Sequence, residues 1–554
     1  MATADKVFVN GKIYCIEPRN KCVEAVAIKD GKYLAVGTEK EMEDFVSSVT
    51  EVVDLEGKTV LPGFHDMHTH AINGAYKQIF ECSLPEGQGI TLDLILNVIR
   101  EYVKDHPDFK WITGGNWPFH LLSQLHKELL DQIDSTRPII LIDFSTHNAW
   151  VNSKTLEIAG IDSTTPDPEG GQIIKDDQGE PTGVLLENAL NLIQPHIPER
   201  KKEDIYKAGE WLSEYLNSFG ITAIKDPAVY EELLDVYVSL AKRNKLHFRL
   251  ATHLLWKCDY GNAIPYEQQI ELVYNRDKYK HDRINTNYAK MFLDGVPAFK
   301  TGAFLEPYAG DKKENYDWKK MLLVDPEELK EDLVKLDKEG VTVKMHATGD
   351  AAVRIGLDAI QAAREQNGYS GLLHEIAHNG WVHREDIVRF KKLHAVAEFS
   401  PMFWYPSVFH KQKETILGKE RADRTYPIRS IQQTGANVVR GSDWPIVPTP
   451  DPWVALETMV TRQNPYIDSS EILNPDEKLK LEEAIELFTI NAAKTMSLEH
   501  VAGSIETGKF ADMIVIDRDL FNISSKDISN VKVLETLVEG EVVYESKGEK
   551  SLEA

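Results

Sequence analysis

Cysteine is scarce in this sequence, with four residues among 554, at positions Cys15, Cys22, Cys82 and Cys258. No two of them have the close spacing of a zinc finger, and their scatter argues against a disulfide framework. Long apolar runs are also missing, as is a basic segment followed by an apolar one near the start. We therefore expect reduced thiols, no signal peptide, no membrane partner and a cytoplasmic location.

Positive charge is in deficit, because 63 Lys and Arg face 88 Asp and Glu, which gives a formal net charge of −25. An acidic surface repels phosphate, so nucleic acid is not expected as a partner. The sequence contains no glycine-rich phosphate loop either. The apolar fraction of 42% and the charged fraction of 27% are ordinary for a globular protein, so we expect a folded chain.

Both ends of the chain are rich in short strand-like segments. Residues 1–60 contain the dipeptides Asn10-Gly11 and Asp30-Gly31, which are typical of hairpin turns because they accept positive φ. Residues 497–554 have a similar pattern. Neither end has enough strands to bury a sheet face, so we expect one β-sandwich domain composed of both termini. Two unrelated β segments are the alternative.

The middle of the chain, residues 61–496, alternates helical patterns with short apolar strands such as HFRLATHLL and VTVKMHATGD. This alternation favours an α/β fold with a parallel sheet, here a (β/α)₈ (TIM) barrel. Residues 80–220 are rich in Trp, Pro and Gly. We interpret that stretch as an insertion near the barrel mouth that covers the active site, with a separate binding domain as the alternative.

Metal-capable side chains recur near the ends of the predicted strands. The apolar segment VLPGFHDMHTH ends in His68-Thr69-His70, and residues two apart in a strand point to the same face. A single His-X-His is a weak signal of a metal site. The same strand-end position is taken by four further residues: Lys290, His346, His378 and Asp443.

Each of these residues has a simpler interpretation when it is taken alone. A lone His346 or His378 is more often a hydrogen-bonded core histidine, and Asp443 could serve in a turn. Lys290 could be a barrel lysine paired with Asp294. Barrel enzymes, however, place their chemistry at the C-terminal ends of the strands. Because the same layout repeats five times, we interpret the residues as one cluster.

The order His-X-His, Lys, His, His, Asp on successive strands resembles the amidohydrolase superfamily, and most closely its YtcJ-like branch, which includes N-substituted formamide deformylases. The resemblance covers nearly the whole chain. It is carried by these motifs: LPGFHDMHTH (61–70), HNAWVNSKTLEIAGI (147–161), TPDPEGGQI (165–173), GEPTGVLLENA (179–189), FLDG (292–295), HATGDAAV (346–353), GSDWPIVPTPDP (441–452) and NAAKTM with GSIETGKFADMIVID (491–517).

The resemblance implies a distorted barrel that holds one or two divalent ions. It assigns His68 and His70 to the first ion and His346 and His378 to the second. Lys290 would bridge the two ions as a carbamate, and Asp443 would be both ligand and general base. Zinc is the expected metal, with manganese, iron or nickel as alternatives.

The sequence departs from the pattern of the branch at two positions. Lys225 stands where relatives often carry His, and Ala377 stands where a Glu is common before the second-metal histidine. Neither change removes an implied ligand. Both leave open which residues support the ligands.

The implied chemistry is hydrolysis of an amide or formamide C–N bond in a small molecule. A divalent ion lowers the pKa of bound water from about 15.7 to about 7, and Asp443 would accept the proton and return it to the leaving nitrogen. A lactonase or esterase and a deaminase could use the same metal site. A non-catalytic barrel scaffold is a further alternative, although such relatives usually lose ligands.

Four residues are candidates for contacts with the substrate. Trp117, His120 and His147 lie in the Trp-rich stretch, where core packing is the alternative. Arg429 could hold a substrate anion, and a structural salt bridge is equally plausible. We expect a homodimer, because this is the commonest assembly.

Overall fold

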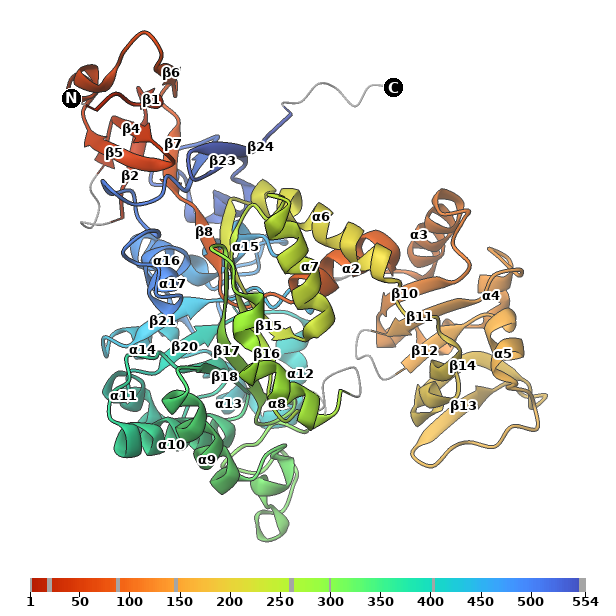
Figure 1. Cartoon of the computed structure of the whole chain (residues 1–554). Coiled ribbons are helices and arrows are strands. Elements are labelled where there is room, and N and C mark those ends of the chain that lie inside the picture. The colour runs from red at the N-terminus through yellow and green to blue at the C-terminus, as the bar shows by residue number, and fades with distance from the viewer. Residues whose placement is uncertain are drawn as a thin grey trace. The chain divides into compact units, whose positions relative to one another are not determined.

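The computed structural model spans the chain and describes residues 2–16, 22–85, 90–143, 148–258, 264–297, 300–400 and 404–547. The described residues form two compact units (Figure 1). The first unit contains residues 1–71 and 210–554, and the second contains residues 72–209. Each unit has its own sheets and its own buried core.

An eight-stranded parallel sheet is the centre of the first unit. Its strands are, in order along the sheet, β8 (Phe64–Asp66), β15 (Ile221–Val229), β16 (Arg249–Leu255), β17 (Ile284–Phe292), β18 (Thr342–Ala347), β19 (Glu375–His378), β20 (Val396–Phe399) and β21 (Asn437–Arg440). The amide of Met67 donates to the carbonyl of Arg440 at 3.0 Å, and Thr69 forms a parallel bridge with Trp444. These contacts join the first and last strands, so the predicted (β/α)₈ barrel is confirmed as a nearly closed parallel barrel.

Helices connect the barrel strands along the chain (Figure 1). They are α6 (Lys202–Ser218), α7 (Glu231–Lys242), α8 (Tyr266–Tyr274), α9 (Pro326–Lys338), α10 (Asp350–Asn367), α11 (Arg384–Lys392), α12 (Val408–Leu417), α13 (Lys419–Asp423), α14 (Ile428–Gln432), α15 (Pro452–Thr461), α16 (Leu481–Phe488) and α17 (Ile490–Thr495). Every residue of β15 and β16 is buried, as expected for strands covered on both faces. None of the helices in the described residues is long and apolar enough to span a bilayer.

Two further sheets come from the chain ends. One has the order β5-β4-β1-β6 and the other the order β24-β23-β22-β7-β2-β3. Their strands are β1 (Lys6–Val9), β2 (Lys12–Tyr14), β3 (Cys22–Val23), β4 (Ala25–Lys29), β5 (Lys32–Gly37), β6 (Glu51–Asp54), β7 (Thr59–Pro62), β22 (Met513–Ile516), β23 (Val533–Val538) and β24 (Glu541–Glu545). The short helix α1 (Glu39–Met42) follows β5.

The two chain ends share one core, in which Phe8, Ile13 and Val60 pack with Met513 and Leu537. The prediction that both termini build the additional sheets is therefore confirmed. The Asp30-Gly31 turn joins the antiparallel strands β4 and β5, as expected of a hairpin. The Asn10-Gly11 turn does not make a hairpin, because β1 pairs with β4 and β6 while β2 pairs with β3 and β7. The chain crosses there from one sheet to the other.

The second unit contains a six-stranded mixed sheet of order β13-β14-β12-β11-β10-β9. Its elements are α2 (Ala71–Phe80), whose first residue belongs to the first unit, β9 (Cys82–Ser83), α3 (Leu92–Asp105), β10 (Ile112–Trp117), α4 (Lys127–Asp131), β11 (Ile139–Asp143), β12 (Asn148–Val151), α5 (Ser153–Ala159), β13 (Gly171–Lys175) and β14 (Pro181–Glu187). Ile95, Ile99, Trp117, Leu141 and Trp150 belong to its core. The unit spans residues 72–209, so it begins eight residues before the predicted start at residue 80 and ends eleven residues before the predicted end at residue 220. Its proposed role as a cover of the active site stays a prediction.

An ion-pair cluster connects the barrel to the terminal sheets within the first unit. Arg249, the first residue of β16, lies 3.1 Å from Asp512 and 2.9 Å from Glu539 through its guanidinium nitrogens. The guanidinium also stacks over the ring of Phe510 at 4.1 Å. The side chains of Arg249 and Asp512 are 7% and 4% exposed, so each charge depends on the other for compensation.

Replacing Arg249 by Met leaves the Asp512 carboxylate buried without its partner. We expect the free energy of unfolding to fall by about 3 kcal/mol, the cost of breaking one side of a buried pair. Chemical denaturation followed by circular dichroism measures this change. The control is Lys245→Met, because the Lys245 side chain is 52% exposed and pairs only at the surface. An Arg249→Met protein as stable as the parent would contradict the expectation.

Candidate metal centre

The predicted ligands lie together at the C-terminal end of the barrel. His68 and His70 directly follow β8, and Asp443 follows β21 by three residues. His346 lies near the end of β18, and His378 is the last residue of β19. Lys290, in β17, has its Nζ 4.7 Å from the centre of the Phe292 ring.

His68, His70 and Asp443 form the tightest group. The Nε2 atoms of His68 and His70 lie 3.4 and 3.5 Å from Oδ1 of Asp443. The three residues are 1%, 7% and 7% exposed. Two ligands that are each about 2.1 Å from a tetrahedral zinc ion are separated by about 3.4 Å. The spacing and the nitrogen and oxygen donors therefore fit a divalent ion.

His346 and His378 extend this group. The ring centres of His378 and His68 are 4.8 Å apart, and those of His346 and His378 are 4.5 Å apart. Nδ1 of His378 lies 3.9 Å from Oδ2 of Asp443. Burial lowers the pKa of His346 to about 3, and it lowers that of His378 well below its ordinary value. Both imidazoles are thus neutral near pH 7, which is the form that binds metals.

Lys290 makes no ion pair with any residue that the structure describes, so the alternative of a pair with Asp294 is not found. Asp294 instead accepts the amides of Ala303, Thr348 and Gly349 at 2.9 Å each. Burial lowers the pKa of Lys290 to about 8, and nearby Lys344 adds to the shift. The carbamate on Lys290 stays a prediction.

A chain of buried charges behind His68 was missed by the sequence analysis. Nδ1 of His68 lies 2.5 Å from Oε2 of Glu398 in β20. Nζ of Lys344, in β18, lies 3.6 Å from Glu398 and 3.2 Å from Glu375. Lys225 forms an ion pair with the other oxygen of Glu375. Lys225, Lys344, Glu375 and Glu398 are all 0% exposed.

The Glu398 carboxylate determines which nitrogen of His68 can face an ion. When Nδ1–H donates to Glu398, the lone pair of Nε2 points away from Glu398, on the side where Asp443 lies. Burial raises the pKa of Glu398 to about 8, and the ammonium of Lys344 opposes this shift. A cation bound at Nε2 would favour the ionised carboxylate further.

The backbone around the ligands is closely packed. A Cβ on Gly441 would lie 2.2 Å from Cβ of His68 and 3.0 Å from Oε1 of Glu398, so only glycine fits between them. Oδ1 of Asp66 accepts the amides of His68 and Ser442 at 3.1 and 2.9 Å. Asp66 therefore joins the segment that carries His68 to the segment that carries Asp443.

The four proposed substrate contacts have different surroundings. Trp117 is fully buried in the second unit, and its indole N–H donates to the carbonyl of Leu141 at 2.8 Å. His120 is exposed, with its Nε2 3.0 Å from the carbonyl oxygen of Ile90. Arg429 lies in α14 and its guanidinium makes no hydrogen bond or ion pair with a described residue. His147 lies outside the described residues. The roles of all four stay predictions.

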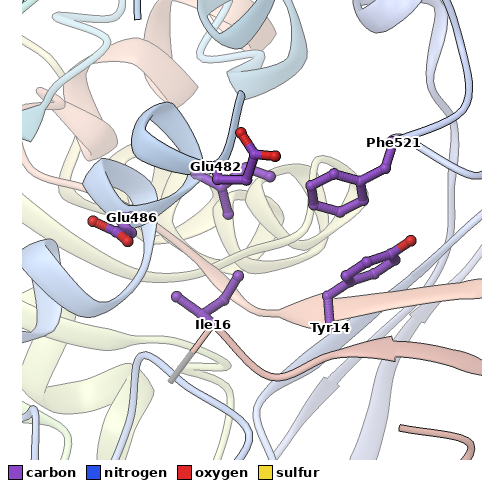
Figure 2. A pocket seen from close by; sticks show the side chains of 6 residues that line it. Tyr14, Ile16, Glu482, Glu486 and Phe521 are labelled. Carbon is purple, nitrogen blue, oxygen red and sulfur yellow. The ribbon is translucent and has the colours of Figure 1, made fainter. Parts of the chain in front are cut away.

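Two hollows of the first unit are lined by none of the predicted ligands. One is lined by Tyr14, Ile16, Phe521 and residues of α16, with the Tyr14 and Phe521 rings close together at one side (Figure 2). The other lies where β16 and β17 begin, and it is lined in part by Arg249 and Arg283. Neither hollow contains a predicted ligand.

A second group of metal-capable side chains, His410, Glu414 and Asp423, lies on α12 and α13. Nζ of Lys419 is 3.2 Å from Glu414 and 2.9 Å from Asp423, so its ammonium already neutralises these carboxylates. We interpret this group as an ion-pair cluster between the two helices.

A parallel barrel with imidazoles and a carboxylate gathered at its strand ends defines a class of metal-dependent hydrolases. The family model of the amidohydrolase family matches residues 51–544. The chain therefore belongs to the amidohydrolase family.

Its similarity to known proteins extends over nearly the full length. The protein LONG AFTER FAR-RED 3 of Arabidopsis thaliana is 30% identical over 98% of this chain and 92% of its own. The N-substituted formamide deformylase of Arthrobacter pascens is 29% identical over 98% of this chain and 99% of its own. The YtcJ protein of Bacillus subtilis is 29% identical over 97% and 99%.

Solved structures share the fold. An uncharacterised metal-dependent hydrolase from Pyrococcus horikoshii superposes with a TM-score of 0.72 at 23% identity, over 94% of this chain and 99% of its own. A zinc-bound adenosine deaminase from Xanthomonas campestris superposes with a TM-score of 0.55 at 12% identity, over 98% and 93%. The resemblance to the YtcJ-like branch is confirmed.

The pair of His68 and Glu398 leads to a prediction about metal affinity. Glu398→Ala removes the acceptor of Nδ1–H, so we expect the dissociation constant of the metal to rise by about 10- to 100-fold. Glu398→Gln keeps an oxygen acceptor, so it should raise the dissociation constant of the metal less than Glu398→Ala does. Competition with a chromophoric chelator measures the constant. Thermal melting without metal reports separately on folding.

The matched control for Glu398→Gln is Glu420→Gln. The side chain of Glu420 is 89% exposed, so water solvates its carboxylate. Unchanged metal affinity in a folded Glu398→Ala protein would show that Glu398 does not position His68.

Proposed function

We propose that this protein hydrolyses an amide or formamide C–N bond of a small molecule with the help of a divalent metal held by His68, His70 and Asp443. The observation that carries the proposal is the buried His-His-Asp group, whose donor atoms have the mutual spacing of ligands on one ion. The name of the Arthrobacter relative supports formamides as the first compounds to test.

The metal would supply Lewis acidity and a water of lowered pKa, which makes hydroxide available near neutral pH. The protein's own residues would do the rest. The Asp443 carboxylate, buried against both imidazoles, would accept the proton of the attacking water and return it to the leaving nitrogen. The imidazoles of His68 and His70 would hold the ion through ring nitrogens, as imidazole does in metal sites.

A second ion is the further part of the proposal. His346 and His378 lie in ring contact, and His378 also approaches Asp443, so they are the residues that would hold it. Lys290 could contribute only as a carbamate, because an ammonium repels a cation. Zinc is the metal we propose first, and zinc is present in a solved structure with the same fold.

The metal content of the purified protein tests the ligand set. We expect one or two equivalents of a divalent transition metal per chain by elemental analysis, and a loss of at least one in His70→Ala. Two equivalents that fall to one without bicarbonate would support the carbamate on Lys290. A protein that binds no metal even after reconstitution with zinc or manganese and bicarbonate would overturn the proposal.

The proton-transfer role of Asp443 is tested by Asp443→Asn. The amide cannot accept a proton, so we expect kcat on a formamide to fall by about 10²- to 10⁴-fold while metal remains bound. Asp358→Asn is the matched control, because its side chain is 42% exposed on α10. Substantial activity in a metal-loaded Asp443→Asn protein would refute the role.

A panel of formamides, anilides, lactones and amino-substituted heterocycles separates the proposed reaction from its alternatives. Turnover of lactones and of no other compound would assign the site to a lactonase or esterase. Release of ammonia from the heterocycles and no other turnover would assign it to a deaminase. No turnover of any compound by the metal-loaded protein would favour a non-catalytic scaffold. The expected homodimer stays a prediction.

A further inference from the structure

Lys413 occupies an unusual position in the segment that links β20 to β21. This segment follows the C-terminal end of β20, so it begins at the end of the barrel where the histidines lie. Nζ of Lys413, on α12, donates to the hydroxyl of Tyr426 at 3.1 Å. The amide of Tyr426 in turn donates at 2.9 Å to the carbonyl of Gly380, two residues after His378.

Tyr426 lies within electrostatic reach of the candidate metal centre. Burial raises the pKa of its phenol, and the carboxylate of Asp443 adds to the shift. The Lys413–Tyr426 pair is therefore joined to the segment after His378, and its phenol interacts electrostatically with Asp443. A substrate held at the histidines would have part of its structure near this pair.

The surroundings of the Lys413 ammonium are aromatic. Nζ lies 4.9 Å from the centre of the Tyr426 ring and 5.6 Å from that of the Trp381 ring. Both aromatic residues are buried, at 6% and 7% exposure. Trp381 donates its indole N–H to the carbonyl of Arg421 at 2.9 Å, which fixes the orientation of its ring.

No carboxylate forms an ion pair with Lys413 among the residues that the structure describes. Glu414, its neighbour in sequence, and Asp423 are both taken by His410 and Lys419. The guanidinium of Arg462, which also acts on Lys413, has the same sign.

This lack of a counter-charge distinguishes Lys413 from Lys225 and Lys344, whose ammonium groups each face a carboxylate. The Lys413 side chain is half-buried, and a partly desolvated ammonium without a counter-charge loses hydration without compensation. Burial lowers the pKa of Lys413 to about 7, and Arg462 adds to the shift. A bound anion would supply the compensation that the protein lacks.

The hydrogen-bond pattern has room for such a ligand. An ammonium has three donors, and one of those of Lys413 is used on Tyr426. Because the Tyr426 oxygen accepts this bond, its own O–H remains free to donate. Two N–H groups and one O–H group can thus converge on the oxygens of a carboxylate.

We propose that Lys413, with Tyr426, recognises a carboxylate or similar anionic group of the substrate, so that the substrates are small amides that carry a negative charge. This inference rests on the proposed hydrolysis and names its substrate class. The sequence analysis had assigned an anion contact to Arg429. Lys413 is the better candidate, because it is joined through Tyr426 to the segment after His378.

The test compares charged and neutral compounds that share one reacting group. N-formyl amino acids, such as N-formylglycine, are paired with their N-methylamides, which lack the carboxylate. For the metal-loaded parent we expect a lower KM for the acids. Lys413→Met should raise the KM of the acids by about 10- to 100-fold, which is the effect of losing a charge-assisted hydrogen bond, and leave that of the methylamides nearly unchanged.

Lys411→Met is the matched control, because Lys411 is exposed on the same helix two residues earlier. Lys413→Arg keeps the positive charge and should restore part of the preference. If Lys413→Met fails to fold, Tyr426→Phe keeps the ring and should still weaken the binding of the acids. The inference is overturned if the parent prefers the methylamides, or if Lys413→Met shifts the KM of both members equally.

Failure of the proposed hydrolysis can be told apart from failure of this inference. If the metal-loaded parent cleaves none of the formamides, titration calorimetry with the same acids and methylamides measures binding directly. Tighter binding of the acids that is lost in Lys413→Met would support the anion contact without the reaction. Equal binding of both compounds would overturn the anion contact.

Discussion

The candidate site depends on a row of charges inside the barrel that have no access to water. Lys225, Glu375, Lys344 and Glu398 alternate in sign and come from four different strands. Removing one partner of a buried pair costs about 3–5 kcal/mol, because the other charge is left uncompensated. Each member therefore fixes its neighbours. The row ends at His68, whose orientation is determined by the barrel interior and not by a loop.

The backbone holds the ligands from the other side. His378 and Asp443 have φ angles of 72° and 63°, in the left-handed region that costs a non-glycine residue about 1–2 kcal/mol. Asp66 offsets part of this cost, because it accepts the amides of His68 and Ser442 on the two segments that meet at the centre. Gly441 has no side chain, which allows these two segments to approach each other closely.

The sequence predicted the barrel, the sheets from both termini and the strand-end histidines, because the alternation of patterns and the His68-X-His70 spacing are local properties. It missed Glu398 and Lys344, although both are charged residues within apolar strands, which was a usable signal. Their partners could not be found in this way, because a contact between residues on different strands, far apart in the sequence, depends on strand order and register. Lys225 was noticed only as a departure from relatives, and the structure pairs it with Glu375.

The charges of the interior also bear on what the site can bind. Lys225 and Lys344 are offset by Glu375 and by the ionised form of Glu398, so this row is neutral as a whole when Glu398 is ionised. Asp443 lies beside the imidazoles of His68 and His70, and Asp294 lies 3.9 Å from Nε2 of His346, so both carboxylates can offset part of the charge of a metal. A single divalent ion would exceed the charge of Asp443, and the ammonium of Lys413 adds to that excess. With a metal bound, the candidate centre would be more positive than the acidic remainder of the protein, and it would attract anionic ligands more than cationic ones.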